Sequence, residues 1–114
     1  MCKRQNLYHE PPIGTVDYCG KCNHIQIAFG NIAFTFDPGD FCRFASAIRE
    51  IGEDEMTQTM GSLNRSIWVG TACQGIHLLL RPFEWSRLND MLDRAETEWK
   101  TLQILEMFAF ESEE

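Results

Sequence analysis

The CGKC motif at residues 19–22 has the clearest chemical content in the sequence. Two cysteine thiolates three positions apart can bind one zinc ion when the chain between them turns tightly, and structural zinc sites use four ligands. The sequence holds no second CxxC pair. We therefore predict Cys19, Cys22 and His24 as candidate zinc ligands. The fourth ligand would be Cys2 or His9 of the N-terminal segment, or the same cysteine pair of a second subunit.

The same motif allows two further interpretations. A redox dithiol requires its first cysteine at a helix N-terminus, where the helix dipole favours the reactive thiolate, whereas a strand is expected to follow this motif. The third interpretation, a tight glycine-containing turn with two ordinary thiols, is the one that the sequence favours. The chain has five cysteines, an odd number, and its first residues lead into no signal-peptide core, so we expect reduced thiols and a cytoplasmic location.

The remaining chemistry-bearing residues indicate no catalytic or cofactor-binding site. Cys42 is expected in the first turn of a helix beside Asp40, where the helix dipole would lower its pKa and the carboxylate would raise it. No histidine is predicted close enough to act as its base. His9, His24 and His77 have no metal-binding spacing among themselves, and the sequence contains no P-loop, nucleophile elbow or dinucleotide fingerprint. We therefore predict no catalytic residue, and enzyme activity is disfavoured.

Length and charge limit the classes of protein and partner. The chain of 114 residues has 44% apolar and 24% charged residues, the balance of one globular domain spanning residues 1–114. No stretch approaches the roughly 20 consecutive apolar residues that a membrane helix needs. The formal net charge is −7 and the isoelectric point is near 4.9. Nucleic acid is therefore an unfavourable partner, because phosphate binding depends on lysine and arginine.

A β-hairpin over residues 25–36 is the strongest secondary-structure signal. Large apolar residues alternate with small or polar ones on either side of Gly30-Asn31, a dipeptide suited to a two-residue turn. This register places Phe29 opposite Ile32, and the face that carries the large side chains is expected to be buried. That face consists of Ile25, Ile27, Phe29, Ile32, Phe34 and Phe36.

A helix is expected to begin at Pro38 and to end at Gly52. Asp37 can accept a hydrogen bond at the N-cap, proline suits the first helical position, and Asp40 places an acid in the first turn. Residues 53–64 are acidic, then polar, without a clear period, so we expect a mobile loop there.

The second half of the sequence repeats this pattern. Strands are expected over residues 67–69 and 76–80, with a turn at 72–75, and Pro82 opens a second helix. Shifting this half back by 44 residues superposes Pro82 on Pro38, together with the acidic, arginine and most apolar positions that follow. We therefore predict an α+β fold of two duplicated β-hairpin-plus-helix units (ββα–ββα), with an antiparallel sheet packed against the helices.

The two units divide the single domain. Residues 15–52 form the first unit and residues 65–110 the second. Residues 1–14 are polar and contain Pro11-Pro12, which no helix or central strand would accept, so this segment is expected to be a tail or an edge segment. A short strand is expected over residues 16–18.

The second helix is long for so small a domain. If it continues from Pro82 to Phe108, it spans about 40 Å at ~1.5 Å per residue. Either it breaks near Thr97, or its distal part packs on a second subunit. The outward faces of the strands also carry few charges, which favours a homo-oligomer, and a dimer is the simplest one. The apolar seam of this helix consists of Trp85, Leu88, Leu92, Ala95, Trp99 and Leu102.

Four segments carry a resemblance to a known family: Tyr18–Cys22, the Phe29-Gly30-Asn31 turn, the Phe34–Phe41 strand-to-helix junction and the Ile76–Leu80 strand. They resemble a small family of uncharacterised cytosolic proteins of Bacteroidota bacteria. The resemblance covers residues 18 to about 105, and it implies a cytosolic bacterial origin and no assigned activity. The duplicated plan is also similar to the Whirly-like fold of single-stranded-DNA-binding transcriptional regulators, although the acidic charge opposes DNA binding.

The leading hypothesis for function is a non-enzymatic interaction or regulatory module that acts as a homo-oligomer. The long helix, the weakly charged strand faces and the lack of a catalytic set support it. The alternatives are a zinc-stabilised domain that uses Cys19 and Cys22, a small-molecule binder with a pocket between helix and sheet, and a single-stranded nucleic-acid binder.

Overall fold

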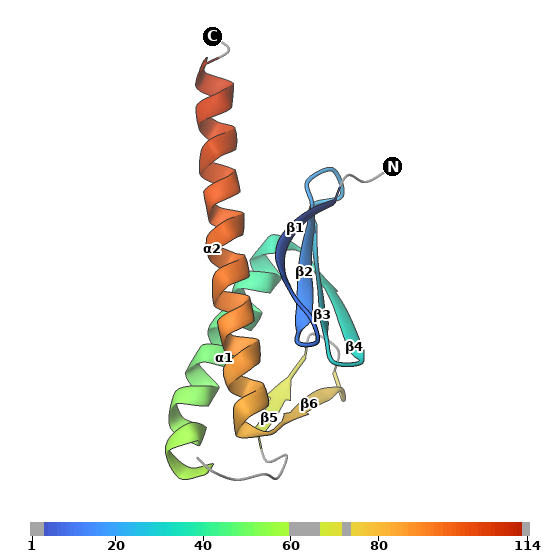
Figure 1. Cartoon of the computed structure of the whole chain (residues 1–114), viewed down its shortest axis with the longest axis vertical. Coiled ribbons are helices and arrows are strands. Elements are labelled where there is room, and N and C mark those ends of the chain that lie inside the picture. Colours follow the sequence, from blue (N-terminus) through green and yellow to red (C-terminus); the bar gives the residue numbers. More distant parts are fainter. Residues whose placement is uncertain (1–3, 60–66, 72–73, 113–114) are drawn as a thin grey trace.

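The computed structural model describes residues 4–59, 67–71 and 74–112. The protein is α+β: a four-stranded antiparallel sheet covers one side of two long helices, and a two-stranded sheet lies near one end of them (Figure 1). The elements are β1 Arg4–Glu10, β2 Gly14–Cys19, β3 His24–Phe29, β4 Ile32–Phe36, α1 Pro38–Thr59, β5 Ile67–Gly70, β6 His77–Leu80 and α2 Pro82–Ser112.

The hairpin of β3 and β4 has the predicted register. Phe29 pairs with Ile32 and Ile25 with Phe36, and Gly30 adopts the positive φ of 62° that the tight turn requires. The predicted burial of the whole apolar face is wrong at one end. Ile25, Ile27 and Phe36 are buried, but Ile32 is 39% exposed, because β4 is an edge strand and Ile32 lies at its turn end.

In the N-terminal segment, Arg4–Glu10 forms β1, an edge strand of the four-stranded sheet. β1 pairs with β2, and the pairing shifts by one residue between Asn6 and Tyr8. Leu7 lies at this irregularity and is buried in the core. β2 is longer than the predicted strand over residues 16–18 and lies between β1 and β3. The four strands therefore follow one another in chain order across the sheet.

Helix α1 begins at Pro38 as predicted, and the carboxylate of Asp37 accepts a 2.7 Å hydrogen bond from the backbone N–H of Asp40. Its predicted end at Gly52 is wrong, because the helix continues to Thr59. Residues 53–59 are therefore helical rather than a loop, and residues 60–64 lie outside the described residues. A glycine inside a helix costs only about 1 kcal/mol relative to alanine, which good helix formers on both sides can offset.

The second hairpin forms a sheet of its own. Ile67 pairs with Leu80 and Val69 with Leu78, and all four side chains are buried. The prediction that Ile76 belongs to this strand is wrong: it precedes β6 and is 54% exposed. The hydroxyl and the backbone N–H of Thr71 both donate to the carbonyl of Ile76 and close the connection there.

The duplication is not confirmed as an exact ββα repeat. β3 and β4 belong to the four-stranded sheet, whereas β5 and β6 form a separate two-stranded sheet. Part of the predicted turn at 72–75 lies outside the described residues.

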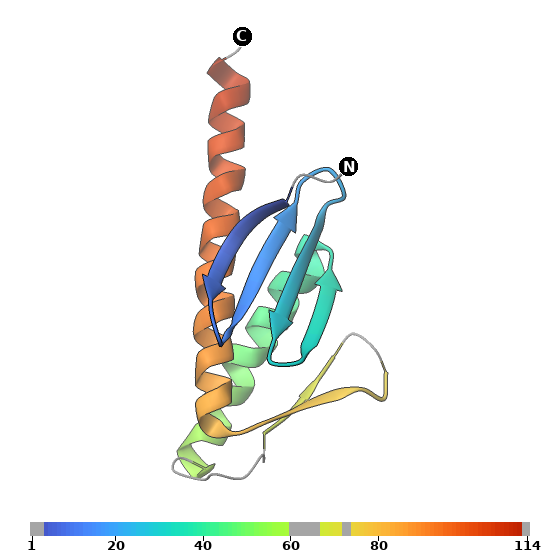
Figure 2. The same ribbon diagram turned by 45° about the vertical axis from the view of Figure 1, so that its right-hand side comes forward.

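Helix α2 is continuous from Pro82 to Ser112, so of the two alternatives the break near Thr97 is wrong. The two helices lie side by side, α2 against β1 and β2 and α1 against β3, β4 and β5 (Figures 1 and 2). The indole N–H of Trp85 donates to the carbonyl of Ile48 at 2.7 Å and links the helices.

Beyond the sheet, α2 projects alone, and the molecule measures 55 × 27 × 26 Å. No helix in the described part of the chain has the length and apolar character needed to cross a membrane.

Candidate functional site

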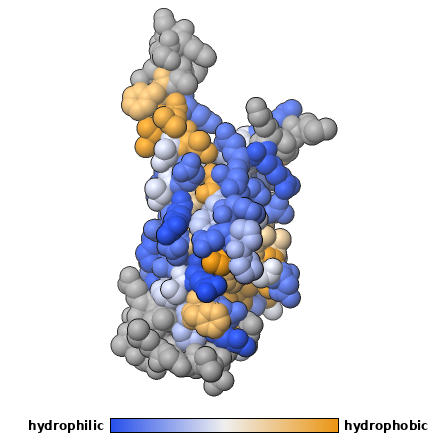
Figure 3. Space-filling view, in the orientation of Figure 1, coloured by the Kyte–Doolittle hydropathy of each residue, from blue (hydrophilic) through white to orange (hydrophobic). Residues whose placement is uncertain are grey.

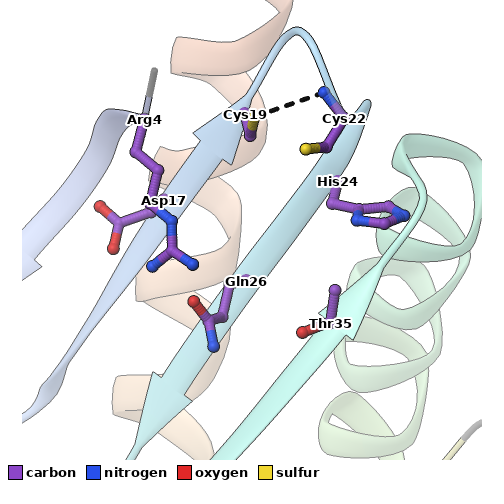
Figure 4. A pocket seen from close by; sticks show the side chains of 7 residues that line it. All are labelled: Arg4, Asp17, Cys19, Cys22, His24, Gln26 and Thr35. Atoms are coloured by element: carbon purple, nitrogen blue, oxygen red, sulfur yellow. Dashed lines mark hydrogen bonds between the residues drawn. The ribbon is translucent and has the colours of Figure 1, made fainter. Parts of the chain in front are cut away.

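The predicted metal ligands lie on the face of the four-stranded sheet that points away from the helices (Figure 4). Side chains alternate along a strand, so the burial of Ile25 and Ile27 against the helices directs His24 and Gln26 to the opposite face. A small depression of about 100 Å³ opens on this face. It is lined by Arg4, Asp17, Cys19, Cys22, His24, Gln26 and Thr35.

Strand pairing places these residues in two rows across the sheet. In the first row, Cys19 of β2 lies between Arg4 of β1 and His24 of β3. In the second row, Asp17 pairs with Gln26, which in turn pairs with Thr35. The side-chain amide of Asn6 donates to the carboxylate of Asp17 at 3.0 Å, and it therefore orients that carboxylate beside the pocket.

The two cysteines of the CGKC motif differ in their surroundings. Cys19 ends β2 and is only 6% exposed, whereas Cys22 is exposed in the turn that follows. Asn23 has a positive φ of 56°, which asparagine tolerates, and the turn folds back over the end of the strand. The backbone N–H of Cys22 donates to the Sγ of Cys19 at 3.3 Å.

The oxidation states also differ from the expectation. Reduced thiols are predicted from the sequence, but Cys22 is disulfide-bonded, while Cys19 is a free thiol. The difference agrees with exposure, because the exposed sulfur is the accessible one of the pair.

The pocket brings together all three predicted zinc ligands, Cys19, Cys22 and His24. However, within residues 4–59, 67–71 and 74–112 no three His, Cys, Asp or Glu side chains are grouped closely enough to hold a metal ion. Of the proposed fourth ligands, His9 pairs with Thr15 at the other end of β1, whereas Cys2 lies outside the described residues. Zinc binding stays a prediction.

Four lining residues were not anticipated from the sequence. Gln26 and Thr35 follow from the alternation of the predicted hairpin, which places them on its outward face together. Arg4 and Asp17 could not be assigned in this way, because Arg4 comes from the segment predicted as a tail or edge, and no pairing register was predicted for the short strand that contains Asp17. The pocket thus offers a thiol, an imidazole, a carboxylate and a guanidinium group on one open sheet face.

Cys42 and His77 lie away from this pocket. Burial, followed by a hydrogen bond to Glu96, raises the pKa of the Cys42 thiol to about 11. This corrects the expected balance between the helix dipole and Asp40: the dominant carboxylate comes from α2. His77 contacts the ring of Trp68 edge-on, with 5.9 Å between the ring centroids, on the exposed face of the two-stranded sheet.

Comparison with known proteins identifies a family for this chain. No curated protein and no solved structure matches it. A family model matches residues 1–111, which is nearly the whole chain. The protein belongs to the family of unknown function DUF6686.

Proposed function

We propose that the protein is a non-enzymatic interaction module that acts as a homodimer through helix α2. The observation that supports this proposal is the apolar distal part of α2, which continues beyond the sheet. In Figure 3 the hydrophobic residues gather on this projecting part of the helix. Its four large apolar side chains are between 53% and 65% exposed: Ile104, Leu105, Met107 and Phe108.

A second copy of the chain is the occupant that fits the placement of exposed residues along α2. Phe83, near the start of the helix, is 48% exposed, and Phe108 is 63% exposed. The step of 25 positions from Phe83 to Phe108 corresponds to about seven turns at ~3.6 residues per turn, so both rings lie on the same side of the helix. An antiparallel pair of α2 helices related by a two-fold axis would place each Phe83 against the partner subunit's Phe108.

The exposed apolar area also suits a dimer. At roughly 100 Å² for each of five half-exposed large side chains, one copy offers about 500 Å² and the dimer buries about 1,000 Å², near the lower limit for a specific interface. Between the two ends of the helix, the exposed face of α2 is polar and carries an ion pair of Asp90 with Arg94 at 3.2 Å. Such an arrangement keeps the outer helix face soluble between its two apolar ends.

Sedimentation equilibrium tests the proposal. We expect the wild-type chain to sediment at twice its mass of 13.2 kDa, and the double variant Leu105→Glu with Phe108→Glu to sediment as a monomer with unchanged circular dichroism. The matched control is Trp68→Glu, because Trp68 is 64% exposed but lies on the two-stranded sheet; this variant should remain dimeric. A wild-type chain that stays monomeric at the highest soluble concentration would contradict the proposal.

A further inference from the structure

The four-stranded sheet has two edges, and they differ in how they are protected (Figures 1 and 2). β1, at one edge, carries charged side chains, its pairing with β2 shifts between Asn6 and Tyr8, and Pro11-Pro12 follows it. β4, at the other edge, has the sequence IAFTF, with no charge, no proline and no shift in its pairing with β3. Charges, prolines and bulges keep an exposed strand edge from pairing with another chain. β4 lacks all three, so the sheet is open to a further strand at this edge.

The register of the β3–β4 hairpin determines which backbone groups of β4 are open. The two residues that flank a two-residue turn exchange hydrogen bonds, and such pairs alternate with non-bonded pairs along an antiparallel ladder. Ile32, Phe34 and Phe36 therefore direct their N–H and C=O groups towards β3. Those of Ala33 and Thr35 point out of the sheet. Both residues are exposed, and no strand in the described part of the chain pairs with β4 on that side.

A groove lies beside each end of this open edge. At the turn end, a groove of about 350 Å³ lies between Ile32 and strand β6. At the other end, a groove of about 430 Å³ is bordered by the rings of Phe36 and Phe44 and by the end of β5. Side chains alternate along both strands of a pair, so an added strand would place every second side chain beside Ile32, Phe34 and Phe36. These neighbours favour apolar side chains at those positions.

A short extended peptide suits this edge better than a second copy of the chain. β4 has five residues, and a symmetric pair of β4 strands would use far fewer than the roughly 20–30 residues a side of a stable protein–protein interface. A peptide that adds to a sheet edge depends instead on backbone hydrogen bonds and on pockets for alternate side chains. The net charge of −7 favours a basic peptide over an acidic one.

We propose that β4 binds an extended, basic peptide segment of another protein, which pairs antiparallel with β4 and carries apolar side chains at every second position. The N–H and C=O groups of Ala33 and Thr35 hold the peptide backbone, and the grooves beside Ile32 and Phe36 accept its apolar side chains. This site goes beyond the homodimer through α2 and does not depend on it, because the two surfaces share no residue.

Fluorescence anisotropy with a labelled peptide of sequence KKVTVTVKK tests the proposal from the side of the peptide. We expect saturable binding to the full-length chain. With the valines beside the apolar side chains of β4, the N–H groups of the two threonines face Ala33 and Thr35, and those of the valines point away. Methylating both threonine nitrogens should therefore weaken binding at least about tenfold. Methylating the first and last valine nitrogens is the matched control and should leave binding within about twofold.

Two substitutions at Thr35 test the proposal from the side of the protein. Thr35→Pro removes an N–H that points out of the sheet and keeps the bonds between β3 and β4, so it should weaken peptide binding at least about fivefold. Thr35→Val keeps this N–H and should bind the peptide like the wild type. Circular dichroism establishes that each variant is folded.

Amide hydrogen exchange of the wild type gives the same information if Thr35→Pro does not fold. Bound peptide should slow exchange at Ala33 and Thr35 at least about tenfold. Phe34 already pairs with Ile27 through hydrogen bonds, so its exchange should change less.

Three results would overturn the proposal. The first is no binding of KKVTVTVKK at up to ~1 mM. The second is equal affinity for the two methylated peptides, which would place the peptide elsewhere. The third is protection of the Ala33 and Thr35 amides that grows with protein concentration in the absence of peptide, which would assign β4 to a second copy of the chain. The variant Leu105→Glu with Phe108→Glu should bind the peptide like the wild type, so a failure of the dimer leaves this test intact.

Discussion

The two hairpin-and-helix halves of the molecule begin alike and end differently. In each half a strand pair leads into a helix that starts with proline, at Pro38 and at Pro82. The helix starts use opposite halves of a capping box. At α1 the side chain of Asp37 accepts from the backbone N–H three residues later, whereas at α2 the side chain of Glu84 accepts from the backbone N–H of Arg81, three residues earlier.

The two halves differ in the sheets that their strands form. β3 and β4 are extended by β1 and β2 into a sheet whose inner face packs on both helices, while β5 and β6 form a sheet of two strands that depends on α1. An isolated two-stranded sheet is marginally stable at best. The first half therefore provides the stable framework, and the second half leaves large apolar groups exposed on the small sheet and on α2. The candidate dimer surface lies in the second half, and the pocket that contains Cys19 and Cys22 lies in the first.

The largest expected effect on the free energy of unfolding comes from removing a buried aromatic side chain of the first half. Phe41 is fully buried, so Phe41→Ala should lower the free energy of unfolding by about 3–5 kcal/mol. Ile76→Ala in the second half truncates a side chain that is 54% exposed and lies outside the proposed dimer interface, and it should cost less than about 1 kcal/mol. Urea unfolding measures both. Similar losses for the two variants would refute the difference in packing between the halves.

A pair of glycine substitutions compares the two sheets directly. A Cβ added at Gly14 of β2 would lie 2.3 Å from the carbonyl oxygen of Ala28, whereas at Gly70 of β5 it would meet nothing within 4 Å. Gly14→Ala should therefore destabilise the protein by about 1–3 kcal/mol, because backbone must shift to relieve the contact.

Gly70→Ala should instead be neutral or stabilise by up to about 1 kcal/mol, because alanine restricts the unfolded chain. Thermal unfolding followed by circular dichroism orders the two variants and the wild type. A melting temperature for Gly14→Ala at or above that of Gly70→Ala would be inconsistent with the close packing of β2 against β3.

The two helix caps should differ in strength. Asp37→Ala removes the acceptor for a backbone N–H at the start of α1 and should cost about 1 kcal/mol. Glu84→Ala removes the reverse hydrogen bond at α2, from a longer and more mobile side chain, and should cost about 0.5 kcal/mol. Urea midpoints distinguish the variants, and Asp37→Asn, which keeps an acceptor, should behave like the wild type. A larger loss for Glu84→Ala than for Asp37→Ala would reverse the ranking.

The smallest expected effect is an alkaline loss of stability in the four-stranded sheet. Burial, followed by a hydrogen bond to Glu10, raises the pKa of Tyr8 from 10.0 to about 12. The folded state therefore holds this proton more tightly than the unfolded state. The resulting stabilisation is complete below pH 10 and is lost as pH rises through about 12.

Melting temperatures between pH 9 and pH 12 test this expectation. Tyr8→Phe cannot ionise, so its melting temperature should fall less steeply with pH than that of the wild type. Parallel curves for the two proteins would assign the alkaline loss to other groups.

Only some of the residues that line the pocket could be predicted from the sequence pattern around them. Cys19, Cys22 and His24 are close in sequence, and their shared pocket follows from one turn between paired strands. Gln26 and Thr35 follow from the hairpin register. Arg4 joins the pocket only because β1 pairs with β2, a contact that the polar composition of residues 1–14 did not indicate. The burial of Cys19 and the exposure of Cys22 also depend on how the turn folds back, which spacing does not encode.

The sequence by itself determined the α+β class, the β3–β4 register and the proline starts of both helices, because each depends on side-chain alternation or capping within a few residues. Tertiary structure alone decided that α1 continues past Gly52, that α2 remains unbroken past Thr97, and that β5 and β6 form a separate sheet. These outcomes depend on packing between segments far apart in the chain, such as Trp85 against Ile48. Local propensity is too weak to predict them, since tertiary contacts routinely override it.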